Sequence, residues 1–420
     1  MADTVLQTTS KRILLQLMGI LYNIGIYGLG LSLRIASLFS AKAKLWVSGR
    51  KNLYPEIPNT KGKQVIWFHC ASLGEFDQGL PLMEKLKQQD TSLFILVTFF
   101  SPSGMQHYHK RKHTADFVMY LPLDTKSNAR KFFSHFQPKK AFFVKYEFWS
   151  NFIFEAKKNN VLLYNVSGIF RPNHRYFKWY GGYFRKTLKA FEWFFVQNRA
   201  SLELLKSINI VNVSISGDSR FDRVLDNKKQ VVKNEIIEVF KGNEALFVIG
   251  SSWPDDEKIL VPFLKNYTGK TLIAPHNIDE SHIQNIINQL SNTIRYSKLK
   301  KNEIVSSNIL ILDTIGQLSN AYSYGSFAYI GGGFSGNLHN ILEPAVFGLP
   351  VIFGPKHIRF PEAQAFIDHE IGISVSTTDE FQTAFDMLNQ NLAELSRKTT
   401  KFIEENTGAS DKIILRITAS

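Results

Sequence analysis

Short apolar runs alternate with helical segments along most of this chain, and this alternation constrains the fold more than any other feature. Between residues 64 and 220, strand candidates occur at 65–69, 93–98, 117–121, 141–144, 161–165, 193–196 and 211–216. The segments between them, such as 76–89 and 201–207, have the spacing of amphipathic helices. This order of elements indicates an α/β domain with a parallel sheet.

The alternation stops at 222–235, a polar and charged stretch, and then starts again. Further strand candidates follow at 246–249, 271–274, 309–312, 327–330 and 350–353. We interpret 222–235 as the crossover between two domains or as a helix beside it. A chain of 420 residues, at about 150 residues per domain, accommodates two such domains and a short additional segment. We therefore expect α/β domains over 46–220 and 221–420, preceded by a separate segment over 1–45.

The segment 1–45 contains a 21-residue run without a charge, residues 13–33. As a helix this run would be roughly 31 Å long, enough to cross the apolar core of a bilayer. Its polar and small residues fall on one narrow stripe, and basic residues flank both ends, as in a helix lying in the interface of an anionic membrane. The segment is predicted to be a membrane anchor, interfacial or spanning. The alternatives are a buried helix of a soluble domain and a cleaved signal peptide. The stripe comprises Arg12, Gln16, Gly19, Asn23, Gly30, Arg34 and Ser37.

The chain carries a formal net charge of +14, which favours a polyanionic partner: nucleic acid, anionic lipid or a phosphorylated substrate. The apolar N-terminal segment favours an anionic lipid surface over nucleic acid. The single cysteine, Cys70, excludes an internal disulfide, and no cluster of His and Cys has the spacing of a metal site. Because His69 and Cys70 are adjacent on a predicted strand, their side chains point to opposite faces, which argues against a paired thiol nucleophile.

Charged residues follow three strands of the first domain, where parallel strands end together and ligands usually bind. Glu75 begins a predicted helix directly after the first strand, as a positioned base or as a simple helix cap. Lys145 follows the fourth strand, and is either directed into the binding cleft or part of a surface ion pair. Arg220, near the domain junction, is either a fork donor to a phosphate or carboxylate, or part of a solvated turn.

In the second domain, Ser251 and Ser252 end a strand and precede a helix that has Pro254 in its first turn. Free N–H groups at such a helix start bind phosphate, or Ser252 simply caps the helix. The segment 330–345 contains four glycines within six residues, at 331, 332, 333 and 336, between a strand and a predicted helix. It is neither a dinucleotide fingerprint nor a Walker A loop, so we expect a nucleotide-sugar loop, with a structural glycine turn as the alternative. Glu343, about one turn inside that helix, would reach ribose hydroxyls.

Taken in order, these segments resemble the 3-deoxy-D-manno-octulosonic acid (Kdo) transferases, which add Kdo from CMP-Kdo to a lipid A precursor. The family's His-x-x-Ser-x-Gly-Glu motif is met at 69–75, and its Asn-x-Leu-Glu motif at 340–343. The apolar N-terminal segment followed by Gly-Arg-Lys at 49–51 also matches. The resemblance covers nearly the whole chain.

The resemblance implies a GT-B fold, in which two Rossmann-like domains face a cleft that holds the active site. It assigns 1–45 to membrane anchoring, 46–220 to binding the acceptor and 221–420 to binding the CMP-sugar. It places the protein on the cytoplasmic face of the bacterial inner membrane, with neither a cofactor nor a metal. Its partners would be the lipid A precursor, CMP-Kdo and the anionic membrane surface.

Carried over by motif, the resemblance makes Glu75 the general base and Arg220 a cation that stabilises the transition state. Lys145 stands where the family has a glutamate that helps to stabilise the transition state. His276 replaces an arginine and Gln317 a glutamate, so a divergent branch is predicted. The predicted CMP site comprises Ser251, Ser252, Pro275, His276, Ile315, Gly316, Gln317, Gly336, Asn340, Ile341, Leu342 and Glu343.

Two other hypotheses remain open from the sequence. One is a GT-B transferase that uses a UDP-sugar on another lipid-linked acceptor. The other is a membrane-attached binding homologue that has lost catalysis, for which Lys145 and Gln317 are the argument. A sugar-nucleotide epimerase of the same fold has no need for a lipid anchor, and is disfavoured for that reason.

Overall fold

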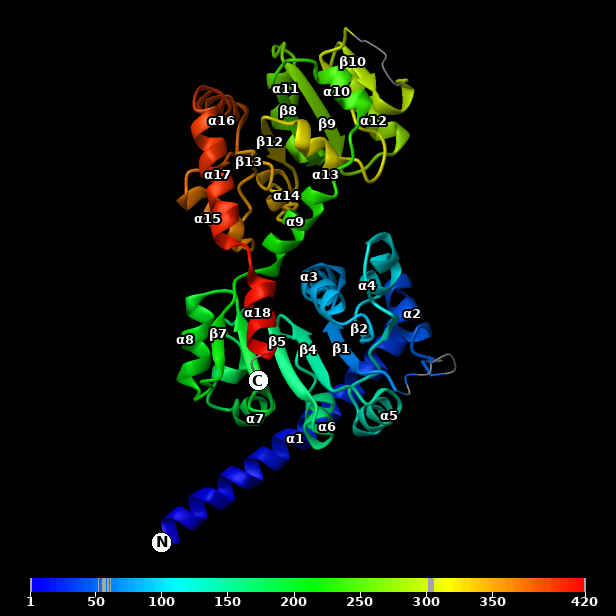
Figure 1. Ribbon diagram of the computed structural model, residues 1–420, viewed down its shortest axis with the longest axis vertical. Coiled ribbons are helices and arrows are strands. Elements are labelled where there is room, and N and C mark those ends of the chain that lie inside the picture. Colours follow the sequence, from blue (N-terminus) through cyan, green and yellow to red (C-terminus); the bar gives the residue numbers. More distant parts are fainter. Residues whose placement is uncertain are drawn as a thin grey trace. The chain divides into compact units, whose positions relative to one another are not determined.

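The computed structural model describes residues 2–51, 53–54, 58, 60, 62–300 and 306–418, which form two compact α/β units (Figure 1). Unit 1 comprises Met1–Arg223 and Gly408–Ser420, and unit 2 comprises Val224–Thr407. Each unit is built on one seven-stranded parallel sheet. The tandem α/β architecture expected from the strand pattern is therefore confirmed.

The sheet of unit 1 has the strand order β3-β2-β1-β4-β5-β6-β7, and all its neighbouring strands are parallel. The order reverses between β1 and β4, and in an open α/β sheet such a switch point is where ligands bind. All seven strands predicted for this half are present. They are β1 (Val65–Cys70), β2 (Phe94–Phe99), β3 (Phe117–Tyr120), β4 (Lys140–Val144), β5 (Leu162–Gly168), β6 (Trp193–Val196) and β7 (Val213–Ile215).

The central strands β1 and β2 of unit 1 are buried on both faces, because successive residues along them contribute to two separate cores. Trp67 packs among Phe132 and Phe143 on one face, while the adjacent Phe68 stacks on Phe142 on the other. The α-helices of this unit are α1 (Ala2–Ala36), α2 (Ala41–Ser48), α3 (Leu73–Gln89), α4 (Pro102–His107), α5 (Lys126–Phe136), α6 (Ser150–Lys158), α7 (Gly182–Leu188), α8 (Arg199–Ser207) and α18 (Ala409–Thr418), and its short 3-10 helices are η1 (Tyr108–Lys110) and η2 (Arg175–Phe177).

The sheet of unit 2 has the order β10-β11-β9-β8-β12-β13-β14, again parallel, with a switch point between β8 and β12. Two of its strands, β10 and β14, were not predicted. Each has three residues and lies at an edge of the sheet, so neither contains the apolar run that marks a buried strand. The strands are β8 (Leu246–Ser252), β9 (Lys270–Pro275), β10 (Thr293–Arg295), β11 (Ile309–Ile311), β12 (Phe327–Ile330), β13 (Val351–Phe353) and β14 (Gly372–Ser374).

Most of the polar stretch 222–235 belongs to a helix, α9 (Ser219–Lys229), along which the chain passes from unit 1 to unit 2. The other helices of unit 2 are α10 (Glu235–Lys241), α11 (Pro254–Leu264), α12 (Glu280–Gln289), η3 (Tyr296–Lys298), α13 (Leu318–Ala321), η4 (Tyr322–Tyr324), α14 (Leu342–Ala345), α15 (Pro361–Asp368), α16 (Thr378–Gln390) and α17 (Leu392–Asn406).

The expected second domain, 221–420, is too long at its C-terminal end, because the chain returns to unit 1 at Gly408. Helix α18 packs against α3, and its residues Ile413 and Ile417 join the core of unit 1 (Figure 1). The carboxylate of Asp222 accepts hydrogen bonds from the backbone N–H groups of Gly408, at 2.6 Å, and Ser410, at 2.7 Å. A helix with one apolar stripe fits either sheet, so the strand pattern alone does not assign it.

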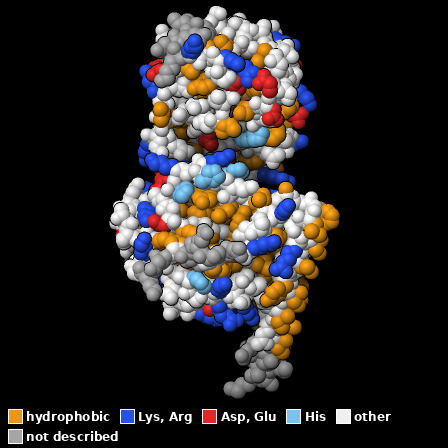
Figure 2. All heavy atoms as spheres, turned by 90° about the vertical axis from the view of Figure 1, so that its right-hand side faces the viewer, with side chains coloured by type: hydrophobic (Ala, Val, Ile, Leu, Met, Phe, Trp, Pro, Cys, Tyr) orange, Lys and Arg blue, Asp and Glu red, His pale blue; other side chains and the backbone are white. Residues whose placement is uncertain are grey.

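Among the described residues, one helical segment, Ile13–Ala36 of α1, is long and apolar enough to cross a membrane by length and composition. Only 11% of that segment is buried. Figure 2 shows an apolar strip along this helix, at the lower right of the view. The exposed side chains include Ile13, Leu17, Ile20, Leu21, Ile24, Tyr27, Leu31 and Ile35, each more than half exposed.

Three members of the polar and small stripe of α1, Gly19, Asn23 and Gly30, face the body of unit 1, and apolar side chains of the helix lie outside. Gly19 lies against the ring of Tyr183, and Gly30 against Leu123, where added β-carbons would come within 3.1 and 2.7 Å. Asn23 accepts a hydrogen bond of 3.1 Å from Asn151. This part of the stripe is thus a docking face, and the alternative of a buried helix of a soluble domain is wrong, because only 11% of the apolar segment is buried.

Candidate functional site

Glu75 lies at the switch point of the first sheet, in the first turn of α3 directly after β1. The hydroxyl of Ser72, the N-cap residue, donates a hydrogen bond to Oε2 of Glu75. The other oxygen, Oε1, lies 3.9 Å from Nζ of Lys145. The side chain of Glu75 is 14% exposed. One of its carboxylate oxygens is thus held by Ser72, and the other lies beside a cation at the edge of the sheet.

Lys145 follows β4 in the left-handed backbone region, with φ of +63°. Non-glycine residues rarely adopt this conformation, and it persists only where neighbouring contacts enforce it. Here Asn165 of β5 donates a hydrogen bond of 2.6 Å to the carbonyl of Lys145, and the Lys145 N–H donates to Val166 at 2.8 Å. These contacts turn the chain at the end of β4. The ammonium group of Lys145 lies within ion-pair distance of Glu75.

A buried histidine, His69, lies on β1 a few residues before Glu75. Nε2 of His69 accepts a 3.0 Å hydrogen bond from the Trp149 indole, while Nδ1 lies 3.0 Å from the hydroxyl of Thr98. Because Nε2 accepts, the geometry assigns the proton to Nδ1. Oε2 of Glu147 lies 3.7 Å from Nε2 of His69 and has no other polar partner among the described residues.

Cys70, next to His69, is fully buried on the opposite face. Burial, together with the charges of Glu75 and Asp77, raises the pKa of its thiol well above the ordinary value. A buried thiol of this kind is inert, which agrees with the prediction against a cysteine nucleophile.

Arg220 uses its guanidinium group on its own turn. Nε and Nη2 contact Oδ2 of Asp218 at 2.8 and 2.7 Å, and Gln78 donates to Oδ1 of the same carboxylate at 2.9 Å. Burial opposes ionisation, but the charge and hydrogen bonds of Arg220 hold the pKa of Asp218 below its usual range. The alternative of a solvated turn is wrong, because Ser216, Asp218 and Ser219 are buried.

In unit 2, Ser251 and Ser252 end β8 at the second switch point. Ser252 is fully buried, and its hydroxyl donates to Glu257 at 2.9 Å. The N-cap of α11 is Trp253, so Ser252 does not cap that helix. Ser251 adopts a left-handed backbone, with φ of +55°, and remains partly exposed.

Three glycines of the glycine-rich loop are required by packing within unit 2. A β-carbon on Gly331 would lie 2.1 Å from the carbonyl oxygen of Ser251, and one on Gly333 would lie 2.5 Å from the amide of Gly354. Gly332 has φ of +89°, and its N–H donates to Asp256 at 2.9 Å. Gly336, with φ of +78°, has no such close neighbour, so the open part of the loop begins there.

The helix after this loop, α14, has four residues, so Glu343 lies in its first turn, not a turn inside. Glu343 accepts a hydrogen bond from the Asn340 amide at 3.3 Å. Ile341 and Leu342 are fully buried and offer only backbone groups to a ligand. Asn340 is exposed.

An aromatic cluster, which the sequence did not indicate, lies at the carboxyl edge of the second sheet. His276 stacks on Trp253 with ring centres 4.0 Å apart, and His339 lies 4.8 Å from His276. The Trp253 indole donates to Nε2 of His339 at 3.3 Å. Burial, with a smaller effect from His276, lowers the pKa of His339 to about 4. Trp253 directly follows Ser252, and His339 directly precedes Asn340. Their positions beside these predicted residues were the available signal.

The remaining predicted residues lie on turns of unit 2. Pro275 ends β9 and is followed by His276. Ile315 is 83% exposed, and Gly316 has φ of +88°. Gln317, the N-cap residue of α13, accepts a long hydrogen bond of 3.4 Å from the side-chain amide of Asn234. Among the described residues, no group of three or more His, Cys, Asp or Glu side chains could hold a metal ion.

Each unit therefore brings together its own set of predicted residues. Unit 1 joins Glu75 and Lys145, which lie 70 positions apart, at one switch point. Unit 2 gathers Ser251, His276 and the open end of the glycine-rich loop at the other. The first set suits proton removal beside a cation, and the second suits binding of a planar, phosphorylated group. The roles of these residues stay predictions.

Comparisons with known proteins show which family this chain resembles. Residues 47–223 match the family model described as 3-deoxy-D-manno-octulosonic-acid transferase (kdotransferase). A 3-deoxy-D-manno-octulosonic acid transferase of Rickettsia bellii is 25% identical over 84% of this chain and 87% of its own length. That of Aquifex aeolicus is 26% identical, over 79% and 88%. A bifunctional glycosyltransferase/methyltransferase of Fusobacterium nucleatum is 26% identical over 87% of this chain, which spans only 59% of that protein.

Solved structures share the fold at low sequence identity. UDP-GlcNAc 2-epimerase from Neisseria meningitidis superposes with a TM-score of 0.61 and 15% identity, over 85% of this chain and all of that one. MurG of Acinetobacter baumannii superposes with a TM-score of 0.53 and 12% identity, over the same shares. The GT-B-like α/β fold and the resemblance to the Kdo transferase family are confirmed.

Proposed function

We propose that this chain, a relative of the Kdo transferases, transfers Kdo from CMP-Kdo to a lipid A precursor of the lipid IVA type. The family resemblance supports the coarser statement, a glycosyltransferase that transfers Kdo in lipopolysaccharide synthesis. The observation that carries the finer proposal is the position of Glu75 at the switch point of unit 1, with one carboxylate oxygen hydrogen-bonded and the other beside Lys145.

In this mechanism Glu75 removes the proton from a primary hydroxyl of the acceptor's glucosamine. Oε1 is the oxygen that accepts it, since Oε2 already accepts from Ser72. The acceptor oxygen attacks the anomeric carbon of Kdo, the bond to the CMP phosphate breaks, and the configuration inverts. A positioned base contributes typically about 10²–10⁴-fold to such a step.

Lys145 stands where the family has an acid. Because the donor sugar is itself an acid, an ammonium group 3.9 Å from the base would attract the sugar's carboxylate toward the attacking oxygen. Arg220 would stabilise the negative charge that grows on the CMP phosphate. Its ion pair with Asp218 fixes the position of the guanidinium group.

Unit 2 would bind the CMP moiety without a metal or a cofactor. Glu343 and Asn340 would hold ribose hydroxyls, and the loop from Gly336 would approach the phosphate. His276 and Gln317 would contact the nucleotide together with Ser251, Ser252, Pro275, Ile315 and Gly316. Ile341 and Leu342 would contribute backbone groups only, since their side chains are buried.

The enzyme would lie on the cytoplasmic face of the inner membrane. Helix α1 docks on unit 1 through Gly19, Asn23 and Gly30, over three turns of its apolar segment. A spanning orientation would draw those contacts into the bilayer core, so α1 is proposed to lie in the interface with its apolar face in lipid. The positive net charge would strengthen attachment to an anionic leaflet.

The test is transfer from CMP-Kdo, generated in situ, to a tetraacyl lipid A precursor in neutral detergent, followed by mass spectrometry. A product heavier by one or more Kdo residues supports the proposal and counts the transfers. Competition by CMP but not UDP would exclude a UDP-sugar donor. The absence of product with intact CMP binding would indicate a different acceptor or a binding homologue without catalysis.

A further inference from the structure

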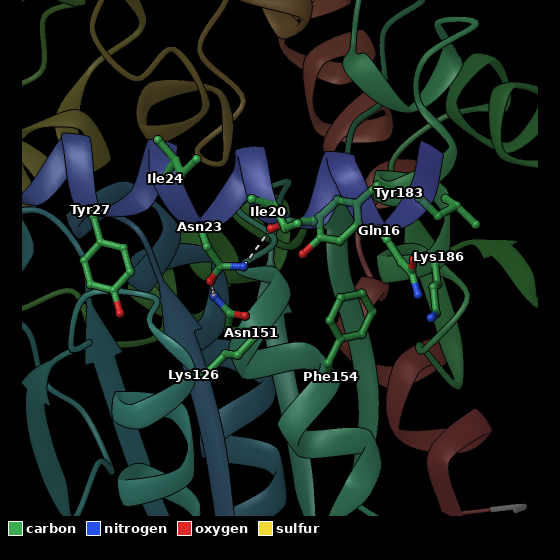
Figure 3. Close-up of a pocket in the computed structure, with 12 residues that line it drawn as sticks. Gln16, Ile20, Asn23, Ile24, Tyr27, Lys126, Asn151, Phe154, Tyr183 and Lys186 are labelled. Carbon is green, nitrogen blue, oxygen red and sulfur yellow. Dashed lines mark hydrogen bonds between the residues drawn. The ribbon is translucent and has the colours of Figure 1, made fainter. Parts of the chain in front are cut away.

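A cavity of about 920 Å³ lies between the N-terminal helix and the body of unit 1 (Figure 3). One wall is α1, which contributes Ile20, Ile24 and Tyr27, and the opposite wall comes from α6 and α7. Asn23 and Asn151, joined by their 3.1 Å hydrogen bond, close its inner side (Figure 3). The volume falls within the range of small-molecule and cofactor sites.

A second cavity, of about 630 Å³, continues from the first and shares four lining residues with it. Its lining is strongly basic, with five cations against a single acid, Glu155, which pairs with Lys158 at 3.2 Å. Among the described residues, no acidic side chain pairs with Lys126, Lys157 or Lys186. The combined site therefore has an uncompensated positive charge. The five cations are Lys126, Arg130, Lys157, Lys158 and Lys186.

The apolar and basic parts of this site are adjacent, which is the order of groups in an amphiphile with an anionic head. Ile20 and Ile24 line the cavity and yet are 57% and 60% exposed, so they are continuous with the apolar face of α1. Lys186 lies across from them, with its ammonium 5.8 Å from the ring of Phe154. Acyl chains would follow the isoleucines, and a phosphate would meet the lysines.

We propose that this site binds one anionic glycerophospholipid of the surrounding bilayer, with its phosphate on Lys126, Lys157 and Lys186. The inference rests on the membrane attachment proposed above, and it goes beyond catalysis because the lipid is neither donor nor acceptor. A bound lipid, with its acyl chains on α1 and its headgroup on α5, α6 and α7, would hold α1 against the body of unit 1 and fix the depth of the protein in the interface.

The experiment is native mass spectrometry of the full chain in neutral detergent with added phosphatidylglycerol or phosphatidylcholine. We expect one phosphatidylglycerol to be retained, with phosphatidylcholine at least tenfold weaker. The triple variant Lys126→Gln, Lys157→Gln, Lys186→Gln should lose the bound lipid by a factor of about 100, since each cation near an anionic group contributes roughly 1 kcal/mol. The matched control is Lys139→Gln, Lys206→Gln, Lys265→Gln, exposed lysines outside both cavities with the same change of charge; it should retain the lipid.

A second pair of variants tests the apolar wall. Ile24→Ser should weaken retention several-fold, whereas Leu31→Ser, equally exposed on the same helix at 59% but outside the cavity, should not. Equal retention of both lipids, or an unchanged triple variant, would overturn the proposal.

The acceptor itself is the other phosphorylated lipid that could occupy this site. If the triple variant raises the KM for the acceptor in phospholipid-free detergent and leaves phosphatidylglycerol retention intact, the site belongs to the acceptor and the proposal is wrong. Failure of the proposed function would appear differently, as a wild-type chain that retains the lipid but transfers no Kdo.

Discussion

Nζ of Lys145 lies 3.9 Å from Oε1 of Glu75, although the two residues follow different strands on either side of the switch point in unit 1. The left-handed backbone of Lys145, held by Asn165 and Val166, directs the chain into this contact. The resemblance predicts a glutamate at position 145, so the candidate base here has a cation beside it where an acid was expected.

Glu75→Gln removes the proton acceptor and keeps the size and the hydrogen bond from Ser72. We expect kcat to fall by about 10²–10⁴-fold, with the melting temperature almost unchanged. Glu203→Gln is the control, because this glutamate is 51% exposed on α8 and, among the described residues, pairs only with Arg199 of its own helix. Steady-state transfer and thermal unfolding are the measurements, and near-normal turnover in Glu75→Gln would refute the assignment.

Lys145→Gly separates the charge of this residue from its backbone strain. Glycine adopts positive φ without the penalty of roughly 1–2 kcal/mol that other residues incur, so the variant should unfold at an equal or higher temperature. Its transfer rate should nevertheless fall at least tenfold, because the ammonium group is gone. Lys145→Gln should lose the same activity without the gain in stability. Full activity in both variants would show that the cation is not used.

Much of the fold could be predicted, because buried parallel strands are nearly continuous apolar runs that are recognisable one by one. The short edge strands β10 and β14 could not, since they have three residues each and no such run. Nor could the return of α18 to unit 1, because the stripe of Ile413 and Ile417 would fit either core.

The candidate site divides in the same way. Motif order identified Glu75 and the segment 340–343, because residues after parallel strands share one edge. Specific side-chain contacts remained hidden: Asp218 on Arg220, Glu257 on Ser252, and Trp253 on His276. The two residues of each pair lie two to 23 positions apart in the sequence, and no local sequence pattern predicts that their side chains meet.

We expect the free energy of unfolding to depend on pH through His339. Burial lowers its pKa from about 6.5 to about 4, so between these values the unfolded chain binds a proton that the folded chain does not. The contribution of the neutral His339 ring to the free energy of unfolding is therefore complete above pH 6.5 and is lost as the pH falls toward 4. Its size is at most about 3 kcal/mol, and less because the ring is partly solvated.

His339→Gln removes this titration. Denaturant unfolding at pH 7, 5.5 and 4 should show wild type losing its advantage over the variant as the pH falls. A difference between the two that does not change with pH would mean that the ring is accessible to protons in the folded state.

The docking of α1 can be tested with two glycines that lie half a turn apart. A β-carbon at Gly30 would come within 2.7 Å of Leu123, whereas nothing lies within 4 Å of one at Gly28. Gly30→Val should therefore lift the helix from unit 1, at a cost of about 1–3 kcal/mol for overpacking. Gly28→Val makes the same change in composition and helix propensity on the lipid side. Limited proteolysis within 36–51 should accelerate in Gly30→Val alone.

The same variant should also loosen the start of α6. Tyr22 of α1 donates a hydrogen bond of 2.5 Å to Asp124, and Asp124 also accepts from the backbone N–H groups of Asn151 and Phe152, so a lifted helix would disturb both contacts. Equal proteolysis of both variants would mean that α1 does not dock through this stripe, and the interfacial orientation would lose its support.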